Sequence, residues 1–325
     1  MASATISPAV SAPKTDPTQL ALEQRAVAAY LGLAIGDALG ATVEFLLPKE
    51  IAHAFGVHRD IKGGGWLKLR PGSVTDDTTM ALALGEAILA DGGEVQGISV
   101  ARAFDAWMRA KPVDIGNTVR RNLISFRRTG NPEAPLCEHD AGNGAAMRVL
   151  PVALACHGRP ESETIAASRQ QTHVTHHNLM SDAACETLVL MVQDFLAGRG
   201  KVEVLHQRAH ALGTAYRAFA FRGRRRENPS GYVVDTMQAV FQAFFDTENF
   251  EDCLIDVVNR GGDADTTGAI AGMLAGAHYG LQAIPPRWLK ALDPHIKAAC
   301  VLQAVNLIRI GSHLTAPAED SAATI

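Results

Sequence analysis

The chain has 325 residues and a formal net charge of −4, with acidic and basic side chains interspersed. This length suits one large domain or two small ones. The charge gives no electrostatic reason to expect nucleic acid or an anionic membrane as the main partner. One basic run, at residues 222–226, lies beside Asn, Pro and Ser and is interpreted first as a solvated loop, with a docking patch for an acidic partner as the alternative.

The five cysteines are odd in number, widely spaced and free of any Cys-x-x-Cys pattern, which is typical of free thiols in a reducing cytoplasm. Residues 1–18 lack the basic start and apolar run of a secretory signal, so we expect a disordered tail there. A second flexible tail is expected at residues 313–325. No apolar stretch approaches the roughly 20 residues of a membrane span.

Helical periodicity dominates the sequence, and strand patterns are almost absent. Val100, Phe104, Trp107 and Met108, for example, form one apolar stripe of a helix. We therefore predict an all-α fold in a single domain over residues 19–312. In chain order the expected helices lie near residues 19–39, 77–90, 100–108, 115–129, 144–156, 161–172, 179–197, 202–220, 231–246, 250–259, 265–280 and 294–310.

Two of these helices carry glycine at every fourth position: Gly32, Gly36 and Gly40 on the first, and Gly268, Gly272 and Gly276 on the second. Glycine costs roughly 1 kcal/mol per helix-interior site relative to alanine, so its repeated use needs a packing reason. Close approach of two helix backbones supplies one. Both helices are therefore expected to be central, which would bring Asp37 and Glu44 near Asp263 and Asp265.

Two acidic clusters stand where helices are expected to begin: Thr-Asp-Asp-Thr at residues 75–78 and Asp-Ala-Asp-Thr-Thr at residues 263–267. Helix capping accounts for one Asp per helix. The adjacent carboxylates repel one another, and divalent cations such as Mg²⁺ and Mn²⁺ prefer oxygen ligands of this kind. One carboxylate can also bridge two ions roughly 3.5–4 Å apart. Spacing alone leaves both interpretations open, two helix caps or one shared metal site.

Several motifs occur in the order typical of one family: Gly-Leu-Ala-Ile-Gly-Asp-Ala-Leu-Gly-Ala at residues 32–41, the two acidic clusters, and Gly-Asn-Gly-Ala-Ala-Met-Arg at residues 142–148. Over roughly residues 25–310 the chain resembles the ADP-ribosylglycohydrolases. Residues 63–67 (Gly-Gly-Gly-Trp-Leu) and 113–118 (Val-Asp-Ile-Gly-Asn-Thr) narrow the resemblance to the dinitrogenase reductase-activating members.

The resemblance implies an orthogonal multi-helix bundle with a dinuclear metal cleft that binds two divalent cations, Mn²⁺ or Mg²⁺. It also implies hydrolysis of the N-glycosidic bond between ADP-ribose and an arginine side chain. By motif match, one ion would be bound by Thr75, Asp76 and Asp77, the other by Asp263 and Thr266, and Asp265 would bridge both.

Two further carboxylates are assigned catalytic roles by the resemblance. Glu44 matches a carboxylate near the metals, and Asp114 matches the acid beside the scissile bond. From the residues alone, Glu44 could be a solvated charge at a helix end and Asp114 a helix cap. Because a guanidine leaving group is strongly basic, its protonation must accompany departure. The sequence does not decide whether Asp114 acts in proton transfer or in ribose ring opening.

The match also implies substrate contacts. Asn117 and Glu138 would hold the target arginine, because a carboxylate is a natural bidentate partner of guanidinium. The Gly142, Asn143 and Gly144 turn would contact phosphate or ribose oxygens. His176 would line the diphosphate or ribose pocket, and Tyr232 would stack on the adenine or ribose.

The histidines at 173, 176 and 177 have no Cys partner and no His-Glu-x-x-His spacing, which argues against zinc. Relatives more often show the His and Asn of the Thr-His-His-Asn segment at residues 175–178 in the opposite order, so the roles of His177 and Asn178 stay open.

By resemblance, the substrate is ADP-ribosylated dinitrogenase reductase and the regulator a PII-type signalling protein. The protein would be a monomer, and its recruitment to a membrane would go through a partner. Two other functions remain open: a non-catalytic, structural or ADP-ribose-binding relative, and a hydrolase of another linkage such as O-acetyl-ADP-ribose or serine-linked ADP-ribose. The intact ligand set argues against the first, and Asn117 with Glu138 discriminates the second.

Overall fold

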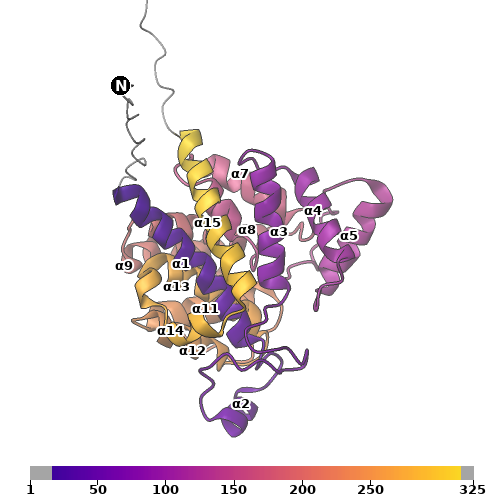
Figure 1. Ribbon diagram of the computed structural model, residues 1–325. Helices are drawn as coiled ribbons and strands as arrows, with labels where there is room; N and C mark the ends of the chain where they lie inside the picture. Colours follow the sequence, from indigo (N-terminus) through magenta and orange to yellow (C-terminus); the bar gives the residue numbers. More distant parts are fainter. Residues whose placement is uncertain (1–16, 316–325) are drawn as a thin grey trace, which may run out of the picture.

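The computed structural model describes residues 17–315. Most of the tails expected at residues 1–18 and 313–325 therefore lies outside the described residues, whereas residues 17–18 and 313–315 belong to the first and last helices. Figure 1 shows the arrangement of the helices. In chain order they are α1 (Pro17–Gly40), α2 (Pro48–Phe55), α3 (Asp76–Ala90), α4 (Gly97–Arg109), α5 (Asn117–Thr129), α6 (Leu150–Ala155), α7 (Glu161–Thr172), α8 (Leu179–Leu196), α9 (Lys201–Val204), the π-helix η1 (Leu205–Ala209), α10 (His210–Ala215), the 3₁₀ helix η2 (Arg217–Phe219), α11 (Val233–Asp246), α12 (Phe250–Val258), α13 (Ala264–Tyr279), the 3₁₀ helix η3 (Leu281–Ala283), α14 (Pro286–Ala291) and α15 (Pro294–Thr315).

The all-α prediction is confirmed, since the described part of the chain contains helices and only two isolated β-bridges, Gly64 with Leu69 and Gly142 with Tyr232. The second bridge explains why the helix expected near residues 144–156 is wrong over its first turns. Asn143 N donates to the Gly231 carbonyl at 3.0 Å, which holds the chain in a turn, and regular helix begins only at Leu150.

One other helix prediction differs from the structure, and two helices of the structure were not predicted. The single helix expected at residues 202–220 is helical through α9, the π-helix η1 and α10, but it ends at Tyr216 (φ −130°, ψ 95°), and η2 follows as a separate turn. The short helices α2 and α14 were not predicted, as each is too short for a clear apolar period.

The centre of the fold is the contact between α1 and α13, which lie side by side in Figure 1. A Cβ placed on Gly36 would overlap the carbonyl group of Gly268, and one on Gly272 would overlap that of Gly32. The two backbones therefore touch directly, as the glycine spacing predicts. Every residue of α13 from Ala264 to Ala277 is buried, because α8, α11 and α12 cover its other faces.

This contact decides where the chain's acidic segments lie. It sets the C-terminal end of α1 against the first turn of α13, where a Cβ on Gly40 would overlap the Ala264 carbonyl. The start of α3 is tied to the same place, because Thr75 N donates to Asp37 Oδ1 at 2.9 Å. Between residues 17 and 315, no helix combines the length and the apolar character needed to cross a membrane.

Arg222, Arg225 and Arg226 of the basic run at residues 222–226 have partners within the protein. Arg222 pairs with Asp246 and Arg225 with Asp256, each at 2.6 Å, and Arg226 donates to Gln238. These contacts favour a structural loop over a docking patch.

Candidate functional site

A cavity of about 480 Å³ opens where the N-terminal ends of α3 and α13 meet. Its lining contains no Lys or Arg among the described residues, but it contains six carboxylates: Glu44, Asp76, Asp77, Asp114, Asp263 and Asp265. The structure thus brings both acidic clusters together with the two carboxylates from other segments. Crowding and burial of so many carboxylates around one space disfavour their charged forms, and either protonation or a cation would relieve this repulsion.

The start of α3 is capped by a residue from another helix. Both Thr75 N and Thr78 N donate to the carboxylate of Asp37, and the Thr78 hydroxyl donates to its Oδ2 at 2.5 Å. Asp76 and Asp77 are therefore free of the capping role. Thr75 is buried, and its hydroxyl donates to Asp77 Oδ2 at 3.1 Å, while the buried Asp77 Oδ1 has no hydrogen-bond partner in the protein.

The start of α13 follows the same plan. Asp263 occupies the position before the helix but makes no side-chain cap hydrogen bond. Instead its Oδ2 accepts from Asn143 Nδ2 at 2.6 Å, and Asn143 also donates to Thr236 at 2.9 Å. Oxygen atoms of Glu44, Asp263 and Asp265 lie within 4.8 Å of one another. In both clusters the carboxylates thus face the cavity rather than cap their helices.

The pKa values of these carboxyl groups reflect the crowding. Burial raises the pKa of Asp76 to about 7 and that of Glu44 to about 8, and neighbouring carboxylates add to both effects. Burial raises the pKa of Asp77 and of Asp265 well above the ordinary range. The partnerless Asp77 oxygen and the all-oxygen donor set fit hard divalent cations, which would relieve this repulsion.

Asp114 and Asn117 lie on another wall of the cavity, in the segment that leads into α5. Helix α5 begins at Asn117 with Gly116 at the cap position, so Asp114 is not its cap. Its Oδ1 accepts from the next backbone N–H, that of Ile115, at 2.7 Å. Asp114 also lies close enough to Asp76 to raise the pKa of that carboxyl.

His176 packs on the turn formed by Gly142, Asn143 and Gly144, where a Cβ on Gly144 would stand 2.8 Å from its ring. Burial and nearby arginines lower the pKa of His176 to about 3, so the ring is neutral. The Thr175 hydroxyl accepts from Arg148 at 2.7 Å and lies 2.8 Å from His176 Nδ1. The hydroxyl proton is thus available to Nδ1, which puts the imidazole proton on Nε2, a donor beside the cavity turn.

Three sequence-predicted residues do not line the cavity: Thr75, Glu138 and Tyr232. Tyr232 is 42% exposed, and its backbone pairs with Gly142 beside the cavity turn. Glu138 is exposed on the loop that precedes this turn, and its backbone carbonyl accepts from Asn178 Nδ2 at 3.1 Å. Asn178 also caps α8 by accepting from Met180 N. Asn178 therefore fixes the backbone at Glu138.

Sequence reasoning gave no chemical role to Phe45 and Trp66, yet both line the cavity. Trp66 Nε1 donates to Glu44 Oε2 at 2.6 Å. The available signal was a tryptophan directly after three glycines, an unusual setting for a large side chain.

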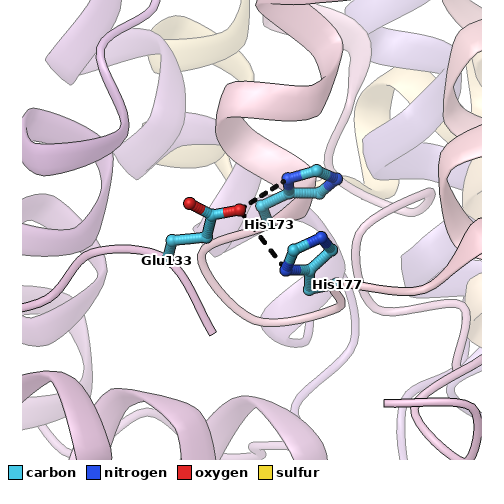
Figure 2. A group of neighbouring side chains, drawn as sticks. All are labelled: Glu133, His173 and His177. Carbon is cyan, nitrogen blue, oxygen red and sulfur yellow. Dashed lines mark ion pairs between the residues drawn. The ribbon is translucent and has the colours of Figure 1, made fainter. Parts of the chain in front are cut away.

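A second cluster anchors the loop that carries Glu138 (Figure 2). Glu133 Oε1 lies 3.5 Å from His173 Nδ1 and 3.4 Å from His177 Nδ1, and the two imidazole rings stack with centroids 3.9 Å apart. His173 Nε2 also contacts Asp182 at 3.0 Å, and His177 Nδ1 contacts the Ala134 carbonyl at 2.8 Å. His176, between them in sequence, is separate and lines the six-carboxylate cavity.

The His173 cluster should make stability depend on pH. Partial burial disfavours the imidazolium, but hydrogen bonds and the charges of Asp182 and Glu133 outweigh it and raise the pKa of His173. A raised folded-state pKa gives stability that is present below the unfolded value of roughly 6.5 and lost as pH rises through the folded value. We expect His173→Gln to cost about 0.5–1 kcal/mol near pH 5.5 and less near pH 8.5, measured by urea unfolding. His53→Gln, on the exposed side of α2, serves as the control; an equal loss at both pH values would contradict this account.

Comparisons with known proteins agree with one another. The family model described as ADP-ribosylglycohydrolase matches residues 18–316. The ADP-ribosyl-[dinitrogen reductase] glycohydrolase of Rhodospirillum rubrum is 48% identical over 279 residues, covering 85% of this chain and 92% of that protein. The ADP-ribosylarginine hydrolase Tri1 of Pseudomonas putida (strain GB-1) is 34% identical, covering 84% and 76%. A solved structure described as an ADP-ribosylglycohydrolase-related protein complex superposes with a TM-score of 0.79 at 36% identity, covering 90% of this chain and 99% of that chain.

Proposed function

Because the chain belongs to the ADP-ribosylglycohydrolase family, we propose that this hydrolase cleaves the N-glycosidic bond between ADP-ribose and an arginine side chain. The observation that carries the proposal is the six-carboxylate cavity, in which two acidic helix starts face Glu44 and Asp114 across one space. The relative named ADP-ribosylarginine hydrolase supports the arginine linkage, and the relative named ADP-ribosyl-[dinitrogen reductase] glycohydrolase supports removal of ADP-ribose from a protein.

The finer proposal is that the substrate is ADP-ribosylated dinitrogenase reductase, which the hydrolase would reactivate. The 48% identity to the Rhodospirillum rubrum protein supports it. A PII-type signalling protein is proposed as regulator and a single-domain monomer as the working form. The five free cysteines support a reducing compartment, the cytoplasm.

The site is proposed to hold two divalent cations, Mn²⁺ or Mg²⁺. Their ligands would be Thr75, Asp76 and Asp77 on one side, Asp263 and Thr266 on the other, and Asp265 between them. When bound, such ions polarise water and orient hydroxyl groups. The partnerless oxygen of Asp77 supports this proposal.

The remaining residues would bind and move protons. The Gly142–Gly144 turn and His176 Nε2–H would donate to diphosphate or ribose oxygens, and Tyr232 would stack on the adenine or ribose. As the C1′–N bond breaks and a water oxygen bonds to C1′, Glu44 would accept a water proton. Asp114 would deliver a proton to the guanidine nitrogen or assist ribose ring opening.

One observation favours a second candidate function. Glu138, proposed to hold the arginine with Asn117, is exposed and does not line the cavity. A hydrolase of serine-linked ADP-ribose or of O-acetyl-ADP-ribose would not need this carboxylate. The two functions are therefore distinguished by testing which linkage the enzyme cleaves.

The decisive experiment is to incubate the Mn²⁺-loaded protein with ADP-ribosyl-arginine and ADP-ribosyl-serine peptides side by side. We expect release of ADP-ribose from the arginine linkage. Asp114→Asn is the matched control: it should keep both metals and bind ADP-ribose while hydrolysis falls by about 100-fold or more, the usual scale for a lost proton-transfer group.

Cleavage of the serine linkage alone would end the arginine proposal. If Asp114→Asn lost its metals, Asp114 would be a ligand rather than a proton carrier. Full activity of that variant would remove Asp114 from the chemistry altogether.

A further inference from the structure

Phe45 and Trp66 form an aromatic rim on the Glu44 side of the cavity. The two residues are 60% and 52% exposed, and their ring centroids lie 5.5 Å apart at an interplanar angle of 47°. Both residues line the cavity itself. Two large aromatic side chains exposed at the mouth of a polar pocket are typical of a surface that a ligand covers.

The backbone is strained in order to present these two rings. Phe45 has a φ of +64°, a conformation that residues other than glycine rarely adopt. It is held there because Phe45 N donates to the Gly262 carbonyl at 2.7 Å, and Gly262 N donates back to Leu46 at 3.0 Å. The rim is therefore fastened to the turn that carries Asp263.

The position of Trp66 is also fixed by an unusual backbone conformation. It follows three glycines that all have positive φ. A Cβ on Gly65 would overlap the Ala41 carbonyl, so only glycine allows the loop to lie this close to the end of α1. The bond from Trp66 Nε1 to Glu44 Oε2 then fixes the edge of the indole and leaves its faces for other contacts.

The charge of the cavity decides what such a rim would bind. Two divalent cations would neutralise four of the six lining carboxylates, and the lining contains no Lys or Arg. The side next to Glu44 therefore remains favourable for a cation. Anionic groups have donors elsewhere, at the Gly142–Gly144 turn and His176 Nε2. A planar cation over an aromatic face is attracted by the negative π surface.

We propose that the Phe45–Trp66 rim binds the guanidinium group of the target arginine and makes the enzyme selective for a cationic leaving group. The inference rests on the proposed function and names a binding surface for its substrate. The rim would provide a binding surface for the arginine on the cavity wall, in addition to the exposed Glu138.

The test compares Trp66→Leu and Phe45→Leu, which remove the aromatic faces, with Trp66→Phe, which keeps a face and removes only the N–H group. KM and kcat are measured with ADP-ribosyl-arginine, and the Kd of free ADP-ribose is measured by calorimetry. We expect the two leucine variants to raise KM by about 3- to 30-fold, the range that cation–π contacts give. Trp66→Phe should raise it less, and the Kd of ADP-ribose should stay within about two-fold in all three.

Glu138→Ala is run in parallel, because a carboxylate alone holding the arginine would show its effect there and none at the rim. Equal rises in KM and in the Kd of ADP-ribose would mean that the rim stacks on the nucleotide, and would overturn the inference. An unchanged KM in both leucine variants would also overturn it. Failure of the wild-type enzyme to cleave ADP-ribosyl-arginine would instead overturn the proposed function, so the two failures are distinguishable.

Discussion

Asp265→Asn is expected to abolish hydrolysis and metal binding together while the protein stays folded. Asp265 lies in the first turn of α13, is buried, and shares its space with Glu44 and Asp263. The substitution keeps the shape of the side chain and removes one negative charge. Loss of even an outer-shell partner commonly costs 10- to 100-fold, so loss of the bridging ligand proposed here should cost at least about 100-fold. Metal content by mass spectrometry and ADP-ribose release together check this result.

The same substitution is expected to have the opposite effect on folding stability in the absence of metal. Burial and neighbouring carboxylates raise the pKa of Asp265 well above 3.8, so the metal-free folded state binds the proton more tightly than the unfolded state. The stability that this group contributes is present at low pH and is lost as pH rises toward the folded-state value. Without metal at neutral pH, Asp265→Asn should therefore melt no lower than the wild type, and only the wild type should gain stability from Mn²⁺. Asp246→Asn, at an exposed ion pair with Arg222, is the control.

Gly36→Ala is expected to destabilise the whole protein by more than about 3 kcal/mol, beyond the usual range for overpacking. A single added methyl group would overlap the Gly268 carbonyl, and backbone on backbone leaves no flexible side chain to move aside. Urea denaturation gives the free energy of unfolding.

Gly200→Ala is the matched control for this substitution. It lies at the start of α9, has an extended backbone, and a Cβ there would meet nothing within 4 Å. If both variants unfolded with the same free energy, the contact between α1 and α13 would be looser than the structure has it.

The sequence predicted the parts of this protein that depend on local pattern. Glycine at every fourth position on two helices has few physical explanations, so the contact of α1 with α13 could be read from it. The same contact predicted that Asp37 and Glu44 would lie near Asp263 and Asp265, whereas spacing alone left open whether the two acidic clusters share one site. The family resemblance then supplied roles that spacing alone left open.

What could not be predicted depends on contacts between distant segments. Residues 144–149 have a helical pattern, but the backbone pairing of Asn143 with Gly231 keeps them in turns. Asp37 caps α3 from another helix, and Trp66 reaches Glu44 across a loop. Glu138 matched a family position, yet its exposure depends on how the loop is anchored by Asn178. No local pattern in the sequence encodes such pairings.

The contact between α1 and α13 also has a consequence during synthesis. Helices α3 and α13 are far apart along the chain, so the acidic residues of α3 leave the ribosome long before those of α13. At roughly 5–20 residues per second, the interval is on the order of ten seconds or more. Until then Asp76 and Asp77 lack the facing carboxylates of Asp263 and Asp265, and long-range contacts of this kind are slow to form. A nascent chain released before α13 is complete would carry half a site, so this hydrolase becomes competent only after α13 has been synthesised.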